Sequence, residues 1–175
     1  MRVGAVRGDI TRERTDAIVN AANAALAPGG GVSGAIHRAA GPALAAACRE
    51  ARRTRWPDGL PVGEAVATAG GDLPARWVIH TVGPNAHAGE TDPALLASCY
   101  RKCLREAAAV GARSVSFPAV SAGIFGWDMA EVARIAVDAV RGVADPGSVE
   151  LARFVLFDDD GLEAFTDALA APPAA

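Results

Sequence analysis

Short apolar runs alternate with longer helix-like segments along the chain, and this alternation limits the fold more than any other feature of the sequence. Runs rich in Val, Ile and Phe are typical of strands that are covered on both faces. Strands that alternate with helices predict an α/β fold, here a three-layer α/β/α sandwich with a central mixed, mostly parallel sheet. The expected strands are residues 2–6, 17–20, 65–68, 77–82, 114–118 and 153–157, and the expected helices are residues 33–40, 43–53, 92–109, 128–143 and 161–170.

The length of the chain predicts one domain. The sequence has 175 residues, of which 51% are hydrophobic, and this is enough for one buried core. No repeat or linker divides the sequence, so residues 1–170 are expected to form a single domain. The closing Ala-Pro-Pro-Ala-Ala, residues 171–175, is expected to be a flexible tail.

The net charge of −3 argues against a basic face that binds the backbone of nucleic acids, so no generic nucleic-acid binding is expected. A local basic cluster occurs at residues 49–55, at the end of an expected helix. Cations at this end of a helix commonly lie on a solvated face, which is the favoured interpretation. The cluster is also a weaker candidate for contact with an anionic partner.

The sequence also carries information about the cellular compartment of the protein. Charged residues or glycines interrupt every apolar stretch, so no membrane span is expected. The first residues lack the apolar core of a secretory signal. The three cysteines, Cys48, Cys99 and Cys103, are odd in number and have no metal-type spacing, which argues against a disulfide scaffold. The expected compartment is a reducing cytoplasm, and neither a metal nor a cofactor is expected.

Two glycine-rich loops follow expected strands. One contains Gly29, Gly30 and Gly31 and leads into a helix, and the other covers residues 121–126. In open α/β sheets ligands bind beyond the carboxyl ends of the strands, and glycines let backbone N–H groups approach a phosphate closely. Two such loops predict a clamp on a diphosphate, with tight structural turns as the alternative. Neither loop has the pattern of a nucleoside-triphosphatase or of a dinucleotide-binding dehydrogenase.

Five motifs then resemble one family in their order along the chain. They are GDIT at residues 8–11, DAIVNAAN at 16–23, GGGVSGAIHRAAG at 29–41, VIHTVGP at 78–84 and FPAVSAGIFGW at 117–127. Together they resemble a macrodomain of the MacroD type, and the segment at residues 62–77 is similar to the middle of that family. The resemblance implies a three-layer α/β/α sandwich that binds ADP-ribose.

The resemblance also implies roles for individual residues. Asp9 would accept a hydrogen bond from the adenine amino group, with Ile10 beside it, although Asp9 alone also fits a capping aspartate. The loops would present backbone to the diphosphate. Asn23 would bind the distal ribose, Phe125 would lie against it, and Asn20 would support the loop. The implied ligand-binding set is Asp9, Ile10, Asn23, Gly31, Val32, Ser33, Ser121, Ala122, Gly123, Ile124 and Phe125.

Ser33 departs from the family pattern, because MacroD-type hydrolases usually carry an aspartate at this position. A serine hydroxyl is not ionised at neutral pH, but it still donates and accepts hydrogen bonds. The implied catalytic set is therefore Asn23, Ser33 and Phe125. Either the phosphate of the ligand would position or activate the water, or Asn23, Phe125 and the backbone amides would hold the scissile bond in a reactive geometry. His37 and His80 are expected to be structural, since no Ser-His-Asp or Cys-His set can be assembled from the sequence.

Three functions follow from these residues. The favoured one is an enzyme that hydrolyses ADP-ribose from modified macromolecules or from related ADP-ribose esters. The second is a non-catalytic reader of ADP-ribose or of ADP-ribosylated targets, and the third is an unrelated α/β domain with structural glycines. The expected partners are ADP-ribose and ADP-ribosylated protein or nucleic acid, and the chain is expected to act as a monomer.

Overall fold

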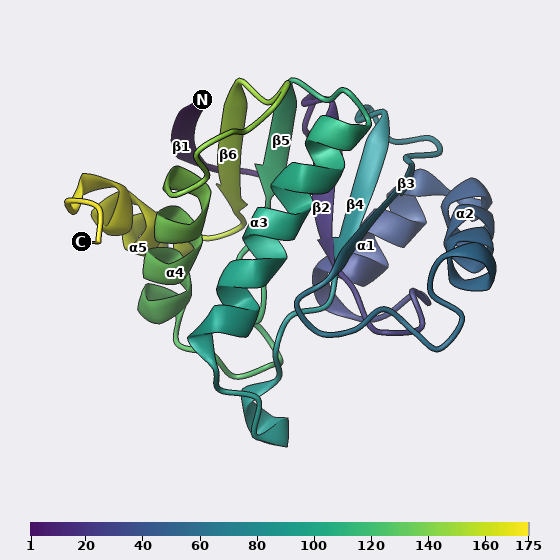
Figure 1. The fold of residues 1–175 in the computed structure, drawn as a ribbon, viewed down its shortest axis with the longest axis horizontal. Coiled ribbons are helices and arrows are strands. Elements are labelled where there is room, and N and C mark those ends of the chain that lie inside the picture. Colours follow the sequence, from purple (N-terminus) through teal and green to yellow (C-terminus); the bar gives the residue numbers. More distant parts are fainter. Residues whose placement is uncertain (175) are drawn as a thin grey trace.

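Six apolar runs pair into one sheet in the computed structural model, which describes residues 1–174 (Figure 1). The order of the strands across the sheet is β1-β6-β5-β2-β4-β3. β3 pairs with β4 in the antiparallel sense and every other pair is parallel, which confirms the predicted mixed, mostly parallel sheet. The strands are β1 (Arg2–Arg7), β2 (Ala17–Ala21), β3 (Ala65–Ala69), β4 (Trp77–Thr81), β5 (Ser114–Phe117) and β6 (Leu151–Leu156).

Three of the longer helices begin after an aspartate that caps them. Asp92, Asp128 and Asp158 each accept a hydrogen bond from a backbone N–H of the helix that follows, which satisfies one of its unpaired donors. The five predicted helices are present, together with two short 3₁₀ helices that no sequence pattern predicted. In chain order, the helices of both kinds are η1 (Ile10–Arg12), α1 (Gly31–Ala40), α2 (Pro42–Thr54), η2 (Ala86–Ala88), α3 (Pro93–Ala109), α4 (Met129–Arg141) and α5 (Asp159–Ala170).

Two apolar cores, one on each face of the sheet, create the three layers. On one face, α3, α4 and α5 pack around a group of aromatic rings, with Tyr100 and Phe117 separated by 5.6 Å between ring centroids. On the other face, α1 and α2 bury Ile36 and Leu44 against the strands. In Figure 1, α3 and α4 lie in front of the sheet and α1 lies behind it. The predicted three-layer sandwich is confirmed.

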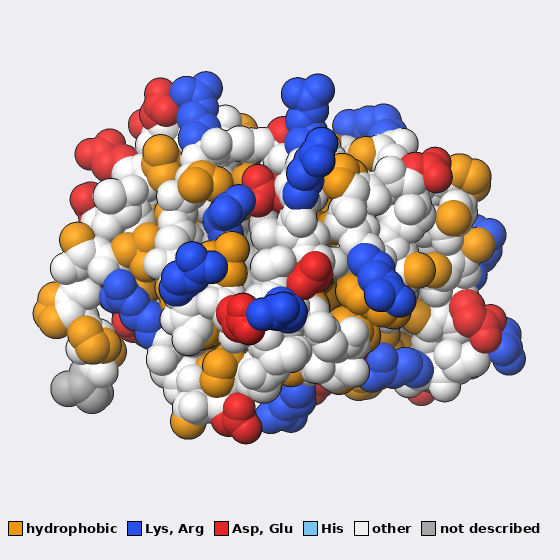
Figure 2. All heavy atoms as spheres, turned by 90° about the horizontal axis from the view of Figure 1, so that it is seen from above, with side chains coloured by type: hydrophobic (Ala, Val, Ile, Leu, Met, Phe, Trp, Pro, Cys, Tyr) orange, Lys and Arg blue, Asp and Glu red, His pale blue; other side chains and the backbone are white. Residues whose placement is uncertain are grey.

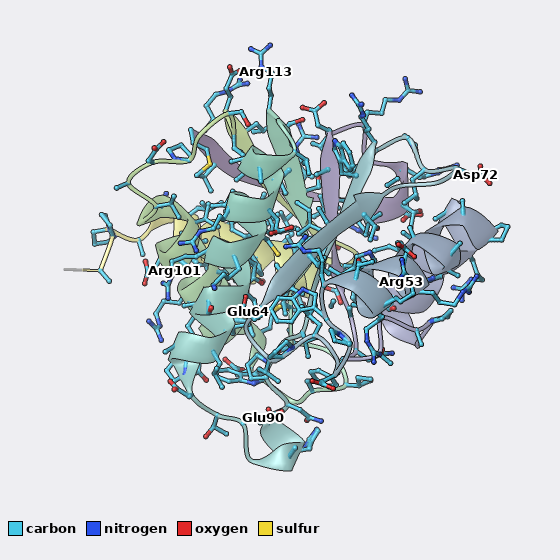
Figure 3. All side chains as sticks on the ribbon, turned by 45° about the vertical axis from the view of Figure 1, so that its right-hand side comes forward. Arg53, Glu64, Asp72, Glu90, Arg101 and Arg113 are labelled. Carbon is cyan, nitrogen blue, oxygen red and sulfur yellow. The ribbon has the colours of Figure 1, made fainter. Side chains whose placement is uncertain are left out.

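The parallel strands bring all their carboxyl ends to one edge of the sheet, the lower edge in Figure 1. Figure 2 views the opposite end, where Lys and Arg side chains are spread over the surface instead of forming one patch. Figure 3 shows the charged side chains pointing outward, with Arg113 at that end and Glu90 at the end where the strands terminate. No helix of residues 1–174 has the length and apolar character needed to cross a membrane.

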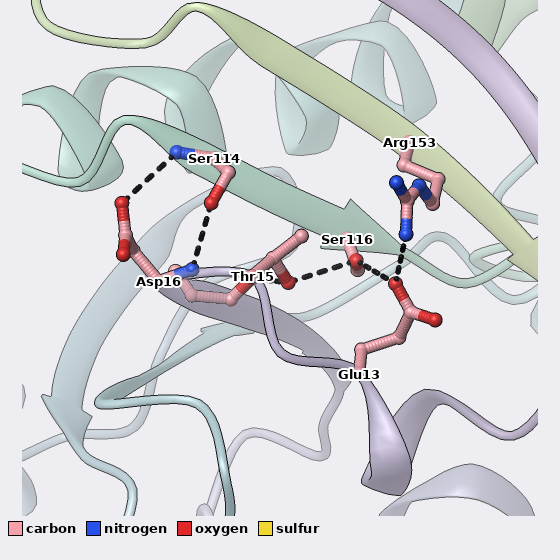
Figure 4. A network of polar contacts seen from close by, with 7 residues as sticks. Glu13, Thr15, Asp16, Ser114, Ser116 and Arg153 are labelled. Atoms are coloured by element: carbon pink, nitrogen blue, oxygen red, sulfur yellow. Dashed lines mark hydrogen bonds and ion pairs between the residues drawn. The ribbon is translucent and has the colours of Figure 1, made fainter.

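A polar network fixes the segment that crosses from β1 to β2 (Figure 4). Oε2 of Glu13 accepts hydrogen bonds from the Ser116 hydroxyl at 2.9 Å and from Nη1 of Arg153 at 3.1 Å. The Ser116 hydroxyl also lies 2.9 Å from Oγ1 of Thr15. These contacts join the crossing segment to β5 and β6, so they also hold Asp9 and η1 at the start of that segment.

The chain beyond α5 is short. Residues 171–174 follow the helix without further helix or strand, and Ala175, the last residue of the predicted tail, lies outside the described residues.

Candidate ligand-binding site

A cavity of about 960 Å³ opens at the carboxyl edge of the sheet. The ends of β1, β5 and β6, the first turn of α1 and the loop before α4 contribute to its walls. Arg7 is the one cationic side chain that lines it within residues 1–174, and Nη1 of Arg7 lies 2.8 Å from Oδ1 of Asp159. Nine predicted ligand-binding residues line the cavity, namely Asp9, Ile10, Gly31, Val32, Ser121, Ala122, Gly123, Ile124 and Phe125.

The first glycine-rich loop delivers the uncapped end of α1 to the cavity. Gly30 is the N-cap residue, and no side chain of the described residues accepts from the first turn of the helix. Gly31 has a φ of +57°, and a Cβ atom placed on it would meet nothing within 4 Å, so this backbone faces open space. The first N–H groups of a helix lack partners within the helix and carry the positive end of its dipole. This wall can therefore bind an anion through main-chain amides.

The second glycine-rich loop is held from below by a buried tyrosine. The hydroxyl of Tyr100 accepts a hydrogen bond from the N–H of Val120 at 3.1 Å and donates one to the carbonyl of Pro118 at 3.2 Å. Ser121 then adopts a φ of 69°, a left-handed conformation that costs energy for a residue with a side chain. Gly123 has nothing within 4 Å of the position of a Cβ atom, so its backbone is open to a ligand.

The far end of the cavity is marked by an ionised carboxylate. Oδ1 of Asp9 accepts from the N–H and from the hydroxyl of Thr11 at 2.9 and 2.6 Å. The Thr11 hydroxyl lowers the pKa of Asp9; desolvation opposes this, and the Thr11 N–H and the Arg12 charge support it. Oδ2 accepts no hydrogen bond from residues 1–174, so it is available as an acceptor.

Phe157 also lines this end of the cavity, although no motif in the sequence marked it as a site residue. It follows the last residue of β6, Leu156, and 82% of it is exposed. An aromatic residue at the end of an apolar run looks like a core residue in sequence. The available signal was its position at the carboxyl end of a strand, which is where ligands bind in such sheets.

Asn23 and Ser33 do not line the cavity. The side chain of Asn23 forms two hydrogen bonds of 3.0 Å with the backbone of Ala27, and so it closes the first loop on itself. The Ser33 hydroxyl is buried and has no hydrogen-bond partner among the described residues. A Cβ atom on Gly29 would lie 3.6 Å from Nδ2 of Asn23 and 3.8 Å from the Ser33 hydroxyl, so the two side chains flank the same glycine.

The two histidines near the first loop are buried. His80 receives a hydrogen bond on Nδ1 from Nδ2 of Asn20 at 3.1 Å, so its Nε2 carries the proton and donates to Thr68 at 2.9 Å. Desolvation, with a smaller effect of the His37 charge, lowers the pKa of His80 to about 3. Burial also lowers the pKa of His37, whose ring nitrogens have no partner in the described part of the chain. Both rings are therefore neutral at pH 7.

No group of three or more His, Cys, Asp or Glu side chains among residues 1–174 is arranged to hold a metal ion. The three cysteines are free and buried.

This α/β/α sandwich, with a cavity between two glycine-rich loops and an amide-lined helix end, defines a domain for an anionic small-molecule ligand. The chain belongs to the Macro domain family, whose model matches residues 19–136. A macro domain-containing protein of Streptomyces nogalater is 57% identical over 160 residues, which cover 91% of this chain and 87% of that protein. An O-acetyl-ADP-ribose deacetylase of Enterobacter cloacae is 46% identical over 166 residues, covering 94% and 91% of the two chains.

Two solved structures are similar over most of this chain. The Oceanobacillus iheyensis macrodomain with ADP has a TM-score of 0.89 and 42% identity, with coverage of 95% of this chain and 88% of the other. The Trypanosoma brucei macrodomain in complex with ADP-ribose has a TM-score of 0.84 and 38% identity, with coverage of 95% and 68%.

Proposed function

We propose that the chain binds ADP-ribose in the cavity between its two glycine-rich loops. The uncapped first turn of α1 carries this proposal, because it offers main-chain amides to a diphosphate, whereas Arg7, the one cationic side chain of residues 1–174 that lines the cavity, is paired with Asp159. The cavity of about 960 Å³ lies in the size range of small-molecule sites. The relatives solved with ADP and with ADP-ribose support the same ligand.

The two ends of the cavity suggest an orientation for the ligand. The carboxylate of Asp9 offers only acceptors, which suits the exocyclic amino group of adenine, and Ile10 would lie beside the base. The exposed ring of Phe157 offers a flat face on which adenine can stack. The diphosphate would then lie between residues 29–34 and 121–126, and the distal ribose would point toward Phe125.

The proposed reaction is hydrolysis of ADP-ribose from modified macromolecules or from related ADP-ribose esters, as in enzymes of the MacroD type. The deacetylase relative supports a hydrolytic reaction on an ADP-ribose ester. For a conjugate with an acidic side chain, the oxygen of water bonds to the anomeric carbon while the bond from that carbon to the carboxylate oxygen breaks. The bonding electrons leave with the carboxylate, and the proton of water passes to a ligand phosphate and then to solvent.

In this reaction the side chains of the protein would mainly position the distal ribose and the water, and they would contribute less to proton transfer. Ser33 cannot act as a carboxylate base, but its buried hydroxyl lacks a partner, and a hydrogen bond from the distal ribose or from water would satisfy it. Asn23 would reach the ribose by exchanging its hydrogen bonds with Ala27 for bonds to the ligand. Phe125 would restrict the orientation of the ribose, which favours a reactive geometry.

One observation favours a non-catalytic reader as the second candidate. Both polar residues of the proposed catalytic set, Asn23 and Ser33, lie outside the cavity lining, and Phe125 has no group that transfers protons. Such a site would bind ADP-ribose or ADP-ribosylated targets through its amides and release them unchanged.

Ser33→Asp tests the choice between these functions. Wild-type protein and the variant are incubated with O-acetyl-ADP-ribose, an ADP-ribosylated protein and an ADP-ribosylated nucleic acid, while calorimetry records binding of free ADP-ribose. General acid–base help is worth about 10²–10⁴-fold, so the variant should release ADP-ribose from acidic-residue conjugates faster than the slow wild type. Tight binding without release from any conjugate by the wild type would leave the reader.

The proposed partners are ADP-ribose and ADP-ribosylated protein or nucleic acid, bound by a monomer in the cytoplasm. The three buried thiols are compatible with a reducing compartment.

A further inference from the structure

The loop that follows β4 packs against the second glycine-rich loop. None of residues 83–90 lines the cavity, yet three of them, Gly83, Ala86 and His87, lie against residues 121–126. The N–H of Ala86 donates a hydrogen bond of 2.9 Å to the carbonyl of Phe125. A Cβ atom placed on Gly126 would lie only 2.6 Å from Nε2 and 2.7 Å from Cε1 of His87. The imidazole therefore occupies the space into which a side chain at position 126 would project.

The turn that carries His87 is itself held by several hydrogen bonds. Oδ1 of Asn85 accepts from the N–H of His87 at 3.0 Å, which caps η2. The N–H of Asn85 donates to Oε1 of Glu90 at 3.1 Å, and the N–H of Glu90 donates back to the carbonyl of Asn85 at 3.0 Å. Figure 3 places Glu90 beside η2, at the tip of this loop. His87 is thus presented by a small closed turn, although its own side chain is exposed.

Gly126 is the point at which the second loop turns back toward α4. Its φ of +76° is left-handed, and the next residue, Trp127, donates its N–H to the carbonyl of Ser121 at 3.2 Å. A glycine is required here for two reasons, the backbone conformation and the contact with the ring of His87. The ring of His87 and the N–H of Ala86 therefore contact two consecutive residues, Gly126 and Phe125.

We propose that His87 is a positioning residue, which fixes the backbone at Gly126 and thereby the ring of Phe125 against the distal ribose. This inference rests on the proposed ADP-ribose site. The amides of Gly31 and its neighbours bind the diphosphate without help from this turn. Loss of the imidazole therefore loosens the orientation of the ribose more than it weakens the hold on the ligand.

Replacement of the imidazole by other groups tests this role. The variants are His87→Ala, His87→Phe, which keeps a flat ring, and His87→Gln, which keeps a polar group without a ring. Steady-state kinetics on O-acetyl-ADP-ribose are expected to show kcat lowered about 10–100-fold by Ala, with KM within about threefold of wild type. Phe should restore kcat and Gln should not. Arg101→Ala, on the exposed surface of α3, is the control and should leave both constants unchanged.

A second test removes side-chain volume at position 87 and adds it at position 126. Gly126→Ala alone should lower kcat, because its methyl group meets the imidazole. The double variant His87→Ala with Gly126→Ala should recover part of that loss, because the methyl group then enters the vacated space. An unchanged kcat in His87→Ala, equal losses in the Ala and Phe variants, or parallel increases in KM and in the Kd for ADP-ribose would overturn the proposal.

The same experiment separates failure of this inference from failure of the proposed function. Wild-type protein that does not bind ADP-ribose defeats the proposed site itself. Wild-type protein that binds ADP-ribose without turnover defeats the hydrolase, and the role of His87 is then measured by the rate of ADP-ribose dissociation. In that case His87→Ala must accelerate dissociation and His87→Phe must not, and equal rates would overturn the inference.

Discussion

Asp9→Ala tests the orientation of the ligand. Oδ1 of Asp9 is committed to Thr11 and Oδ2 is open, so the bound base would gain one hydrogen bond to a charged acceptor. Such a bond contributes about 1.5–3 kcal/mol, and its loss should raise the Kd for ADP-ribose about 10–150-fold. Calorimetric titration with ADP-ribose measures the change. Thr11→Val is the control, because it removes the hydroxyl contact and keeps the carboxylate.

The pH dependence of the same titration checks which form of Asp9 binds. The Thr11 hydroxyl lowers the pKa of this carboxyl, so the acceptor should stay ionised below the ordinary aspartate range. Affinity should therefore be constant on acidification until the lowered pKa is reached, and it should weaken only as Asp9 takes up a proton. An affinity in folded Asp9→Ala equal to that of wild type would refute the assignment of adenine to this end of the cavity.

Three further perturbations probe other parts of the molecule. Gly31→Val should abolish ADP-ribose binding in calorimetry. It should lower the free energy of unfolding in urea by only about 1–2 kcal/mol, since the φ of Gly31 is left-handed but no protein atom lies within 4 Å of the new Cβ. Normal binding by this variant would show that the loop is an ordinary turn. The free energy of unfolding should fall as the pH drops from 6.5 toward 3, because His80 binds a proton in the unfolded chain before it does in the folded one, and His80→Gln should flatten this slope. Glu13→Gln should lower the free energy of unfolding in urea by about 1–3 kcal/mol, because Arg153 loses its charged partner. If the two residues are coupled, Arg153→Met should cost less in the Glu13→Gln background than in the wild type. Equal costs in both backgrounds would argue against the network.

The secondary structure was readable because periodicity and caps determine most of it. Buried parallel strands need continuous apolar runs, and Asp92 and Asp128 mark the starts of two helices by their side chains. The two glycine-rich loops were then placed at one edge of the sheet by topology alone, since parallel strands end on the same side. Local patterns and the parallel sense of the strands were sufficient for these elements.

The parts that were missed depend on contacts between distant residues. The turn at η2 is held by the side chain of Asn85, and no period in the sequence announces it. Phe157 is exposed because β6 ends one residue earlier, at the last pair of its register with β1. Likewise, the burial of the Ser33 hydroxyl follows from how α1 packs on the sheet, which a motif does not encode.

The uncapped start of α1 has an evolutionary consequence. Main-chain amides are supplied by every non-proline residue, so substitutions cannot easily remove them while the fold persists. In the proposed site, recognition of a diphosphate would therefore be inherited with the architecture, and an added side chain at a position such as Gly31 would cancel it. The side chains of Asn23 and Ser33, which flank Gly29, are under no such constraint, and in the proposed site a change at either position would alter the chemistry without altering the amides. Proteins that descend from one ancestral domain would in this way differ in the linkage on which they act and still bind the nucleotide through the same main-chain amides.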